Sequence, residues 1–374
     1  MLAVNPEDRI DSIDAIRGIA LFGVLTVNLV TEFRVSLFQQ FLPSAATGAD
    51  LFVENAVSLV LEQKAFSLFA LLFGVGLGIQ YERLSATGRP FYWLARRLAV
   101  LLVFGLLHLL FVWNGDILTE YAIAGLVVLP LLRLPNKVLF FAALGFLAVY
   151  MVGPRLYSVP WPDAAGLQAH VAAANQVYAT GSLAEIFRFS LGELPLFFTL
   201  HVWVLPRTLA LFVLGMLLWR VGVLRRPREF IYETFGLAVA GIALGVAQPA
   251  ANAGLAPVFL ALGYGAVLLL LAELPGSRSL LAHFAPLGRM AFTNYLLQSL
   301  VFCFIFFGYG LGQFGRMSAA AAFALGVAVY VAQIVLSKWW LRRYRFGPVE
   351  WLWRTLMYGV AQPMRTNGME PAGK

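Results

Sequence analysis

A succession of long apolar runs constrains the fold of this chain more than any other feature. Each run approaches the length of about 20 residues that a membrane-spanning helix needs. Only 12% of the residues are charged, about half the share in a soluble domain, so the chain cannot coat a globule with polar surface. The sequence predicts an all-α, polytopic transmembrane helix bundle of about ten spans, with counts of about nine or eleven still open. The expected spans lie near residues 16–33, 56–80, 95–113, 117–133, 137–153, 203–222, 231–249, 255–273, 288–307 and 318–340.

The basic residues indicate the orientation of the bundle. The formal net charge is +8, but lysine and arginine fall in short loops between apolar runs, which favours membrane lipids over nucleic acid as partners. With an even number of spans, all the basic clusters fall on one face. The positive-inside rule makes that face cytoplasmic, with both chain ends on it, in what we expect to be a bacterial inner membrane. The clusters lie within residues 81–97, 133–137, 220–228, 274–289 and 338–345.

No polar stretch is long enough to hold a soluble domain, so we expect residues 1–374 to form a single integral-membrane domain. The longest segment between spans, residues 154–202, has apolar residues at helical spacing with charges between them. This pattern predicts one or two amphipathic helices in an extracytoplasmic loop. Residues 361–374 are polar and predict a disordered tail.

The first apolar run carries three polar side chains. Asp14 and Arg17 are three residues apart, which places them on one helical face at the cytoplasmic end. They can form a local ion pair that anchors the helix, or Arg17 can bind an anion while Asp14 holds it in place. Asn28 lies about three turns, roughly 16 Å, deeper. Its amide can make an interhelical hydrogen bond or stabilise a developing oxyanion.

A histidine followed by carboxylates marks a second polar concentration. His108 lies in an apolar run, and Asp116 follows at the outer turn. A lone histidine in a helix often has a structural role, but a nearby carboxylate can set the imidazole tautomer and raise its basicity. His108 is therefore our candidate catalytic base, with Asp116 to orient it. No second histidine stands three or four residues from His108, so we predict no metal site.

Several arginines can converge on the cytoplasmic face. In the simpler interpretation they bind lipid headgroups and set the topology. In the more specific interpretation the arginines bind a polyanionic donor such as coenzyme A. Tryptophans near the C-terminus can form an interfacial belt, or a platform for the adenine of this donor. The arginines are Arg96, Arg97, Arg289, Arg342, Arg343, Arg345 and Arg354, and the tryptophans are Trp339, Trp340, Trp351 and Trp353.

Five stretches stand out together: "IDAIRGIALFGVLTVN", "FSLFALLFGVGLGIQ", "RRLAVLLVFGLLHLLFVWNGDILTEYAIAGL", "PLGRMAFTNYLLQS" and "FGPVEWLWRTLMYG". They resemble the YeiB-like membrane proteins, the family of the domain of unknown function 418. The resemblance runs from about residue 9 to about residue 360. The opening motif is also similar to that of wider transmembrane acyltransferase groups. These include the lysosomal heparan-alpha-glucosaminide N-acetyltransferase, which moves acetyl from cytosolic coenzyme A to a sugar amine across the membrane.

The resemblance to the acetyltransferase implies a role for Asn28, which matches an asparagine of that enzyme's catalytic site. The enzyme's catalytic histidine follows shortly after its asparagine, whereas residues 29–55 of this chain contain no histidine. In this chain either His108 would supply the histidine from another helix, or the reaction would differ from that of the acetyltransferase.

These observations lead to one main hypothesis and two alternatives. The main one is a membrane-bound O- or N-acyltransferase that moves an acyl group from cytoplasmic acyl-coenzyme A to a small-molecule or glycan acceptor. In it, Asp14, Arg17 and the cytoplasmic arginines bind the donor, and Asn28, His108 and Asp116 form the catalytic site. The first alternative is a transporter or lipid-binding protein whose polar side chains line a substrate path. The second is a purely structural membrane partner, and homo-oligomerisation stays open in each case.

Overall fold

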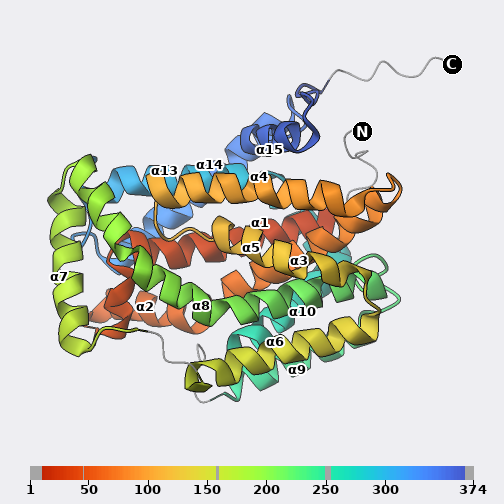
Figure 1. Ribbon diagram of the computed structural model, residues 1–374, viewed down its shortest axis with the longest axis horizontal. Coiled ribbons are helices and arrows are strands. Elements are labelled where there is room, and N and C mark those ends of the chain that lie inside the picture. Colours follow the sequence, from red (N-terminus) through yellow and green to blue (C-terminus); the bar gives the residue numbers. More distant parts are fainter. Residues whose placement is uncertain (1–10, 45, 157–159, 249–253, 367–374) are drawn as a thin grey trace.

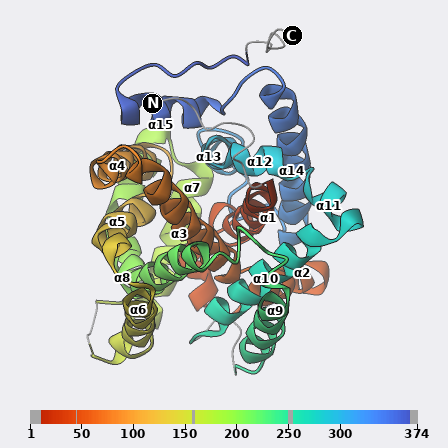
Figure 2. The same cartoon turned by 90° about the vertical axis from the view of Figure 1, so that its right-hand side faces the viewer.

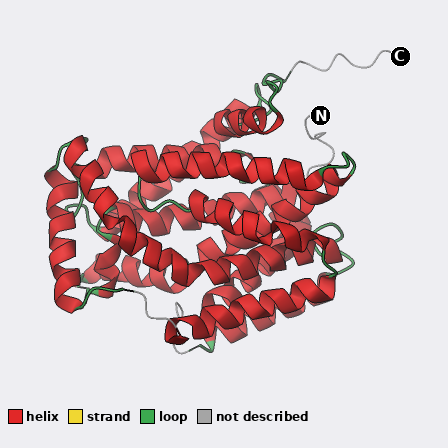
Figure 3. Cartoon of the chain, viewed as in Figure 1, coloured by secondary structure: helices red, strands yellow, loops and turns green. Residues whose placement is uncertain are grey.

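The computed structural model describes residues 11–44, 46–156, 160–248 and 254–366, and helices account for about four-fifths of this part of the chain (Figure 3). The expected all-α bundle is therefore confirmed. The longer helices are α1 (Asp11–Asn28), α2 (Gly48–Val60), α3 (Lys64–Ser85), α4 (Pro90–Phe111), α5 (Leu118–Val128), α6 (Asn136–Leu156), α7 (Ala164–Thr180), α8 (Leu183–Val221), α9 (Ile231–Val246), α10 (Ala256–Glu273), α13 (Ala291–Phe306), α14 (Ala319–Leu341) and α15 (Pro348–Tyr358). The short ones are α11 (Pro275–Leu281), α12 (Ala285–Arg289), the π-helix η2 (Leu29–Phe33), and the 3₁₀ turns η3 (Leu37–Phe41) and η4 (Leu129–Arg133).

The apolar runs correspond to helices. Every run expected to span the membrane overlaps one of the longer helices above, although residue 249, at the end of one run, lies outside the described residues. Within the described part, 7 helical segments are long and apolar enough to cross a membrane, while α9 and α13 are apolar but shorter. The chain is thus a helical membrane protein, and the count of about ten spans stays a prediction.

The long helices lie side by side, and α7 crosses one end of them (Figure 1). Both described chain ends and α15 lie toward the opposite end. Seen along the bundle, α1 is in the centre and the other helices surround it (Figure 2). The apolar window of α1 is accordingly 78% buried, compared with 17% for α6. The polar residues of the first run are therefore inside the bundle and not on its lipid-facing surface.

The segment expected as an extracytoplasmic loop contains α7 and the first half of α8. A helix of 39 residues is about 58 Å long, roughly twice the hydrocarbon thickness of a bilayer. It includes Pro195 and Pro206, and it joins the expected amphipathic segment to the expected span without a break. At the other end of the chain, residues 361–366 run beside residues 343–345, where the Arg345 N–H donates to the Met364 carbonyl at 2.9 Å. Residues 367–374 of the expected tail lie outside the described residues.

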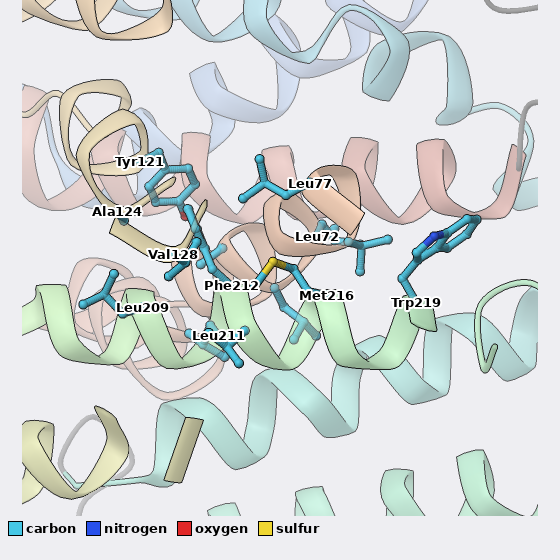
Figure 4. Close-up of a cluster of buried hydrophobic side chains, with 14 of the residues drawn as sticks. Leu72, Leu77, Tyr121, Ala124, Val128, Leu209, Leu211, Phe212, Met216 and Trp219 are labelled. Carbon is cyan, nitrogen blue, oxygen red and sulfur yellow. The ribbon is translucent and has the colours of Figure 1, made fainter. Parts of the chain in front are cut away.

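Small residues allow the central helices to approach each other closely. A Cβ atom on Gly74 of α3 would lie 2.2 Å from the Phe212 backbone oxygen of α8, and one on Gly215 would lie 2.1 Å from the Leu71 oxygen. The two backbones therefore touch, as in small-residue packing between membrane helices. Around this crossing Leu72, Tyr121, Phe212, Met216 and Trp219 form part of the main buried cluster (Figure 4). A second close approach lies between α1 and α12, where a Cβ atom on Gly18 would lie 2.3 Å from the Phe284 backbone oxygen.

Candidate functional site

A cavity of about 290 Å³ lies among α1, α3, α4, α13 and α15. Its wall carries more cations than anions, because six arginines stand there with only two carboxylates, Asp14 and Glu350. The surplus of guanidinium groups makes this end of the cavity a site for a polyanion, since each guanidinium can bind a phosphate through two parallel hydrogen bonds. The arginines are Arg17, Arg83, Arg97, Arg289, Arg345 and Arg354.

The cavity changes from charged to apolar as it enters the bundle. Along α3 its wall runs from the exposed Arg83 to Phe69, which at 1.5 Å per residue is about 20 Å. At the inner end the wall consists of Ile117, Leu118, Tyr121 and Tyr295, and both tyrosines are buried. A ligand with an anionic head and a long, weakly polar arm fits this gradient.

The pair Asp14 and Arg17 lies in the charged part of the wall. Arg17 Nη1 donates to Asp14 Oδ1 at 2.7 Å, and both side chains line the cavity. Arg17 thus forms the expected ion pair with Asp14 and also stands in the cavity wall, where it can contact an anion. The close approach of Gly18 and Gly288 brings α1 against α12, which places Arg289 on the same wall as Arg17.

The amphipathic helix α15 forms the outer part of the wall and is fixed by two anchors. Glu350 Oε1 accepts hydrogen bonds from the Phe292 N–H at 2.8 Å and the Thr293 N–H at 3.0 Å, so it caps the first turn of α13 from another helix. Burial raises the pKa of the Glu350 carboxyl, while these hydrogen bonds lower it in part. Trp353 Nε1 donates to the Arg97 carbonyl at 2.9 Å, and the Arg97 guanidinium lies 3.6 Å above the Trp353 ring. Of the four tryptophans considered as a platform for the adenine, Trp353 lines the cavity.

His108 and Asp116 form a buried pair just beyond the inner end of the cavity. His108 Nδ1 lies 2.8 Å from Asp116 Oδ1, and the side chains are 2% and 0% exposed. The second carboxylate oxygen of Asp116 accepts the Thr119 N–H at 2.7 Å, at the start of α5. This network assigns the proton to Nδ1 and leaves a lone pair on Nε2. Among the described residues Nε2 has no hydrogen-bond partner, so its lone pair is available to take a proton.

The pair and the cavity are joined through two residues of the wall. The Tyr295 ring lies between them, with its centroid 5.4 Å from the imidazole, and its hydroxyl accepts the Ile117 N–H at 3.4 Å. His108 does not line the cavity itself. The pair is therefore one side chain away from the inner end.

Asn28 ends α1 deep in the bundle, and the π-helix η2 follows it. Such a turn inside a helix often marks a functional site. The side chain is buried, and in the described part of the chain its Oδ1 has no hydrogen-bond partner. No hydrogen bond or ring contact joins Asn28 to His108 within the described residues. The structure thus brings His108 and Asp116 together, and it does not link Asn28 to them.

The remaining predicted arginines lie outside the cavity wall. Arg96 Nη2 donates to the Leu356 carbonyl at 3.0 Å, the Arg343 guanidinium lies 4.8 Å from the Trp339 ring, and Arg342 is exposed. Conversely, Arg83 and Glu350 line the cavity although the sequence did not single them out as site residues. Arg83 stands in a basic loop cluster, so the only available signal was its position on the last turn of a helix.

Comparison with known proteins assigns the family. The chain is 32% identical to the uncharacterized protein YxaH of Bacillus subtilis (strain 168), over 96% of both chains. A family model described as "Protein of unknown function (DUF418)" matches residues 209–360. The chain belongs to the YeiB-like DUF418 family. Two further relatives are the uncharacterized protein YeiB of Escherichia coli (strain K12), 29% identical over 95% of this chain and 98% of YeiB, and an uncharacterized 39.9 kDa protein of Bacillus acidopullulyticus, 30% identical over 96% of both chains.

The part of the chain that matches the DUF418 model contributes one side of the cavity. It runs from α8 to α15 and includes Arg289, Tyr295, Glu350, Trp353 and Arg354. The resemblance that the sequence motifs indicated is therefore confirmed for the family, and the relatives are bacterial.

Proposed function

We propose that this DUF418 protein transfers an acyl group from acyl-coenzyme A to a hydroxyl or amine acceptor. One observation carries the proposal: the arginine-lined cavity becomes apolar inside the bundle and ends next to the buried pair of His108 and Asp116. The phosphates of coenzyme A match the six arginines in charge, and the thioester arm matches the apolar inner half. A volume of about 290 Å³ suits the acyl-pantetheine arm alone, so the nucleotide part would rest at the charged end.

The chemistry assigned to the pair is general base catalysis. The acceptor oxygen or nitrogen attacks the thioester carbon and gives its proton to His108 Nε2 while Asp116 holds Nδ1–H. The C–S bond then breaks, and the leaving thiolate takes the proton back from His108. Tyr295 supports this step, because its hydroxyl accepts the Ile117 N–H and keeps its own proton to donate to the thioester carbonyl oxygen.

The proposed location is the bacterial cytoplasmic membrane, with the arginine end of the cavity and both chain ends in the cytoplasm. Support comes from the basic clusters of the sequence, because several of their arginines, including Arg83, Arg289 and Arg345, line the charged end of the cavity. The donor would then enter from the compartment that holds coenzyme A, and the acceptor would come from the other side or from the membrane.

Calorimetric titration of the purified protein in lipid nanodiscs tests the proposal. We expect acetyl-coenzyme A to bind at least about tenfold more tightly than acetyl-pantetheine, which lacks the phosphates that meet the arginines. Equal binding of the two compounds, or no binding of either, would contradict the proposal. Substrate counterflow in proteoliposomes without acyl turnover would favour the transport alternative instead.

A further inference from the structure

A second, smaller pocket lies at the opposite end of α1, near the end of the bundle that α7 crosses (Figure 1). Its volume is about 10 Å³, which accommodates one group of the size of a water molecule or an ammonium. The pocket does not overlap the arginine-lined cavity, because the two share no lining residue. Its lining comprises Glu32, Ser36, Leu37, Trp113, Asn114, Tyr178, Glu193, Phe197, Phe307 and Phe314.

Glu193 provides the first of two carboxylates in this pocket. The side chain is buried on α8, and Asn114 Nδ2 donates to its Oε2 at 2.7 Å while His170 Nε2 lies 2.8 Å from its Oε1. The Tyr178 hydroxyl donates to the same carboxylate. Burial beside Glu193 raises the pKa of Tyr178, so the phenol keeps the proton that it donates. The network fixes Glu193 as a hydrogen-bond acceptor facing the pocket.

Glu32 provides the second carboxylate and differs from Glu193 in having no partner. It lies on η2, which begins directly after Asn28, and it is partly buried. Within the described residues no hydrogen bond or ion pair satisfies its carboxylate, and no arginine or lysine lines the pocket. Gly115 leaves room for it, because a Cβ atom there would lie 2.6 Å from Glu32 Oε2. A partly buried carboxylate without a partner is costly, so the pocket favours a cation.

The remaining lining is aromatic, which selects the kind of cation. The Tyr178 ring stacks on the Phe307 ring, with their centroids 4.8 Å apart, and its centroid lies 5.1 Å from that of Phe314. Trp113 also lines the pocket. Aromatic faces attract organic ammonium ions, and carboxylates complete such sites with direct hydrogen bonds. Among the described residues, no group of three or more histidine, cysteine, aspartate or glutamate side chains stands together as a metal site would need.

We propose that this pocket binds the primary ammonium group of a small organic amine. This binding does not depend on the proposed function. Trp113 lies between the pocket and His108, with the Trp113 and His108 ring centroids 6.3 Å apart, and Tyr295 lies between His108 and the arginine-lined cavity. An amine in the pocket is therefore out of contact with a ligand in the cavity, and the pocket is a separate binding site.

The binding test uses ethylammonium chloride as the probe, with ethanol as its neutral counterpart and tetramethylammonium as a cation too large for the pocket. We expect ethylammonium to raise the unfolding temperature above that in equal sodium chloride, and the other two probes not to do so. Glu32→Gln should weaken ethylammonium binding by about tenfold or more, while Glu229→Gln, an exposed carboxylate, should leave it unchanged. Undiminished binding in Glu32→Gln, or equal stabilisation by ethanol, would overturn the proposal.

A parallel titration with acetyl-coenzyme A separates this inference from the proposed function. The pocket stands, and the transferase proposal fails, if ethylammonium binds as described but acetyl-coenzyme A does not bind. Glu32→Gln should keep the affinity of the protein for acetyl-coenzyme A, because Glu32 does not line the donor cavity. This result also shows that the variant is folded, so a loss of ethylammonium binding in it reports on the pocket.

Discussion

His108 Nδ1 lies 2.8 Å from Asp116 Oδ1, in a part of the bundle where neither side chain reaches solvent. The two residues come from opposite sides of the non-helical turn between α4 and α5. On one side of this turn Ile117 lines the donor cavity, and on the other Asn114 lines the small carboxylate pocket. A single turn therefore lies beside both spaces and carries the carboxylate that pairs with the imidazole.

Replacement of His108 should abolish turnover without affecting donor binding. His108→Gln removes the lone pair that takes the acceptor proton, so we expect the rate of acyl transfer to fall by about 10²- to 10⁴-fold. The affinity for acetyl-coenzyme A should stay within about twofold, because His108 does not line the cavity. His283→Gln, at an exposed position, is the control. Equal rates in both variants would remove His108 from the mechanism.

Arg17 and Arg342 were both candidate donor-binding residues in the sequence, and the structure separates them. Arg17 lines the cavity, whereas Arg342 is exposed outside its wall. Arg17→Gln should weaken acetyl-coenzyme A binding by about 10- to 100-fold, as expected for the loss of a hydrogen bond to a charged group, and Arg342→Gln should change it by less than about twofold. Calorimetry measures both values. A loss of the same size in the two variants would mean that the arginines attract the ligand only through the overall positive electrostatic potential of this surface, and not through direct contacts.

Two glycines of one helix should respond in opposite ways to an added methyl group. Gly74→Ala places a Cβ atom 2.2 Å from the Phe212 backbone oxygen, whereas nothing lies within 4 Å of a Cβ on Gly76. We expect Gly74→Ala to destabilise the protein by about 1–3 kcal/mol and Gly76→Ala to stabilise it by up to about 1 kcal/mol. Thermal unfolding in detergent gives the comparison. A tolerated Gly74→Ala would show that α3 and α8 are not in backbone contact.

The proposed orientation predicts which surface residues a membrane-impermeant maleimide reaches in intact cells. Cys303, the single cysteine, is first changed to serine. A cysteine at the exposed Gln176 of α7 should be labelled in intact cells, while one at the exposed Ser279 of α11 should be labelled only after permeabilisation. The reverse pattern would place the arginine-lined cavity outside the cytoplasm and exclude cytoplasmic acyl-coenzyme A as donor.

The helices could be predicted from the sequence because a bilayer imposes a fixed length of apolar chain. The apolar pattern does not predict the full length of α8. Glu193 and two prolines interrupt the apolar run, while the helix continues through them. The π-helix after Asn28 has no sequence signature either, and it carries Glu32 to the small pocket. A local pattern therefore identifies the membrane-spanning segments. It does not determine where a helix continues beyond its span or where the helix type changes.

The candidate site was predictable only where its partners are close in sequence. Asp14 with Arg17, and His108 with Asp116, lie within a few turns of each other, and the structure pairs both. Glu193 meets His170 from another helix and Asn114 from a distant turn, contacts that depend on tertiary packing alone. Which cytoplasmic arginines line the cavity depends on packing in the same way, because Arg289 lines it and Arg342 does not although both stand in basic clusters of the sequence.

The most direct test of the account is a density map of the protein in nanodiscs with a non-hydrolysable thioether analogue of acetyl-coenzyme A. The account predicts nucleotide density against Arg17, Arg97 and Arg289, with the arm continuing along α3 to Tyr295 and its acyl end next to His108. A cavity that holds lipid or no ligand at a saturating concentration of the analogue would contradict it.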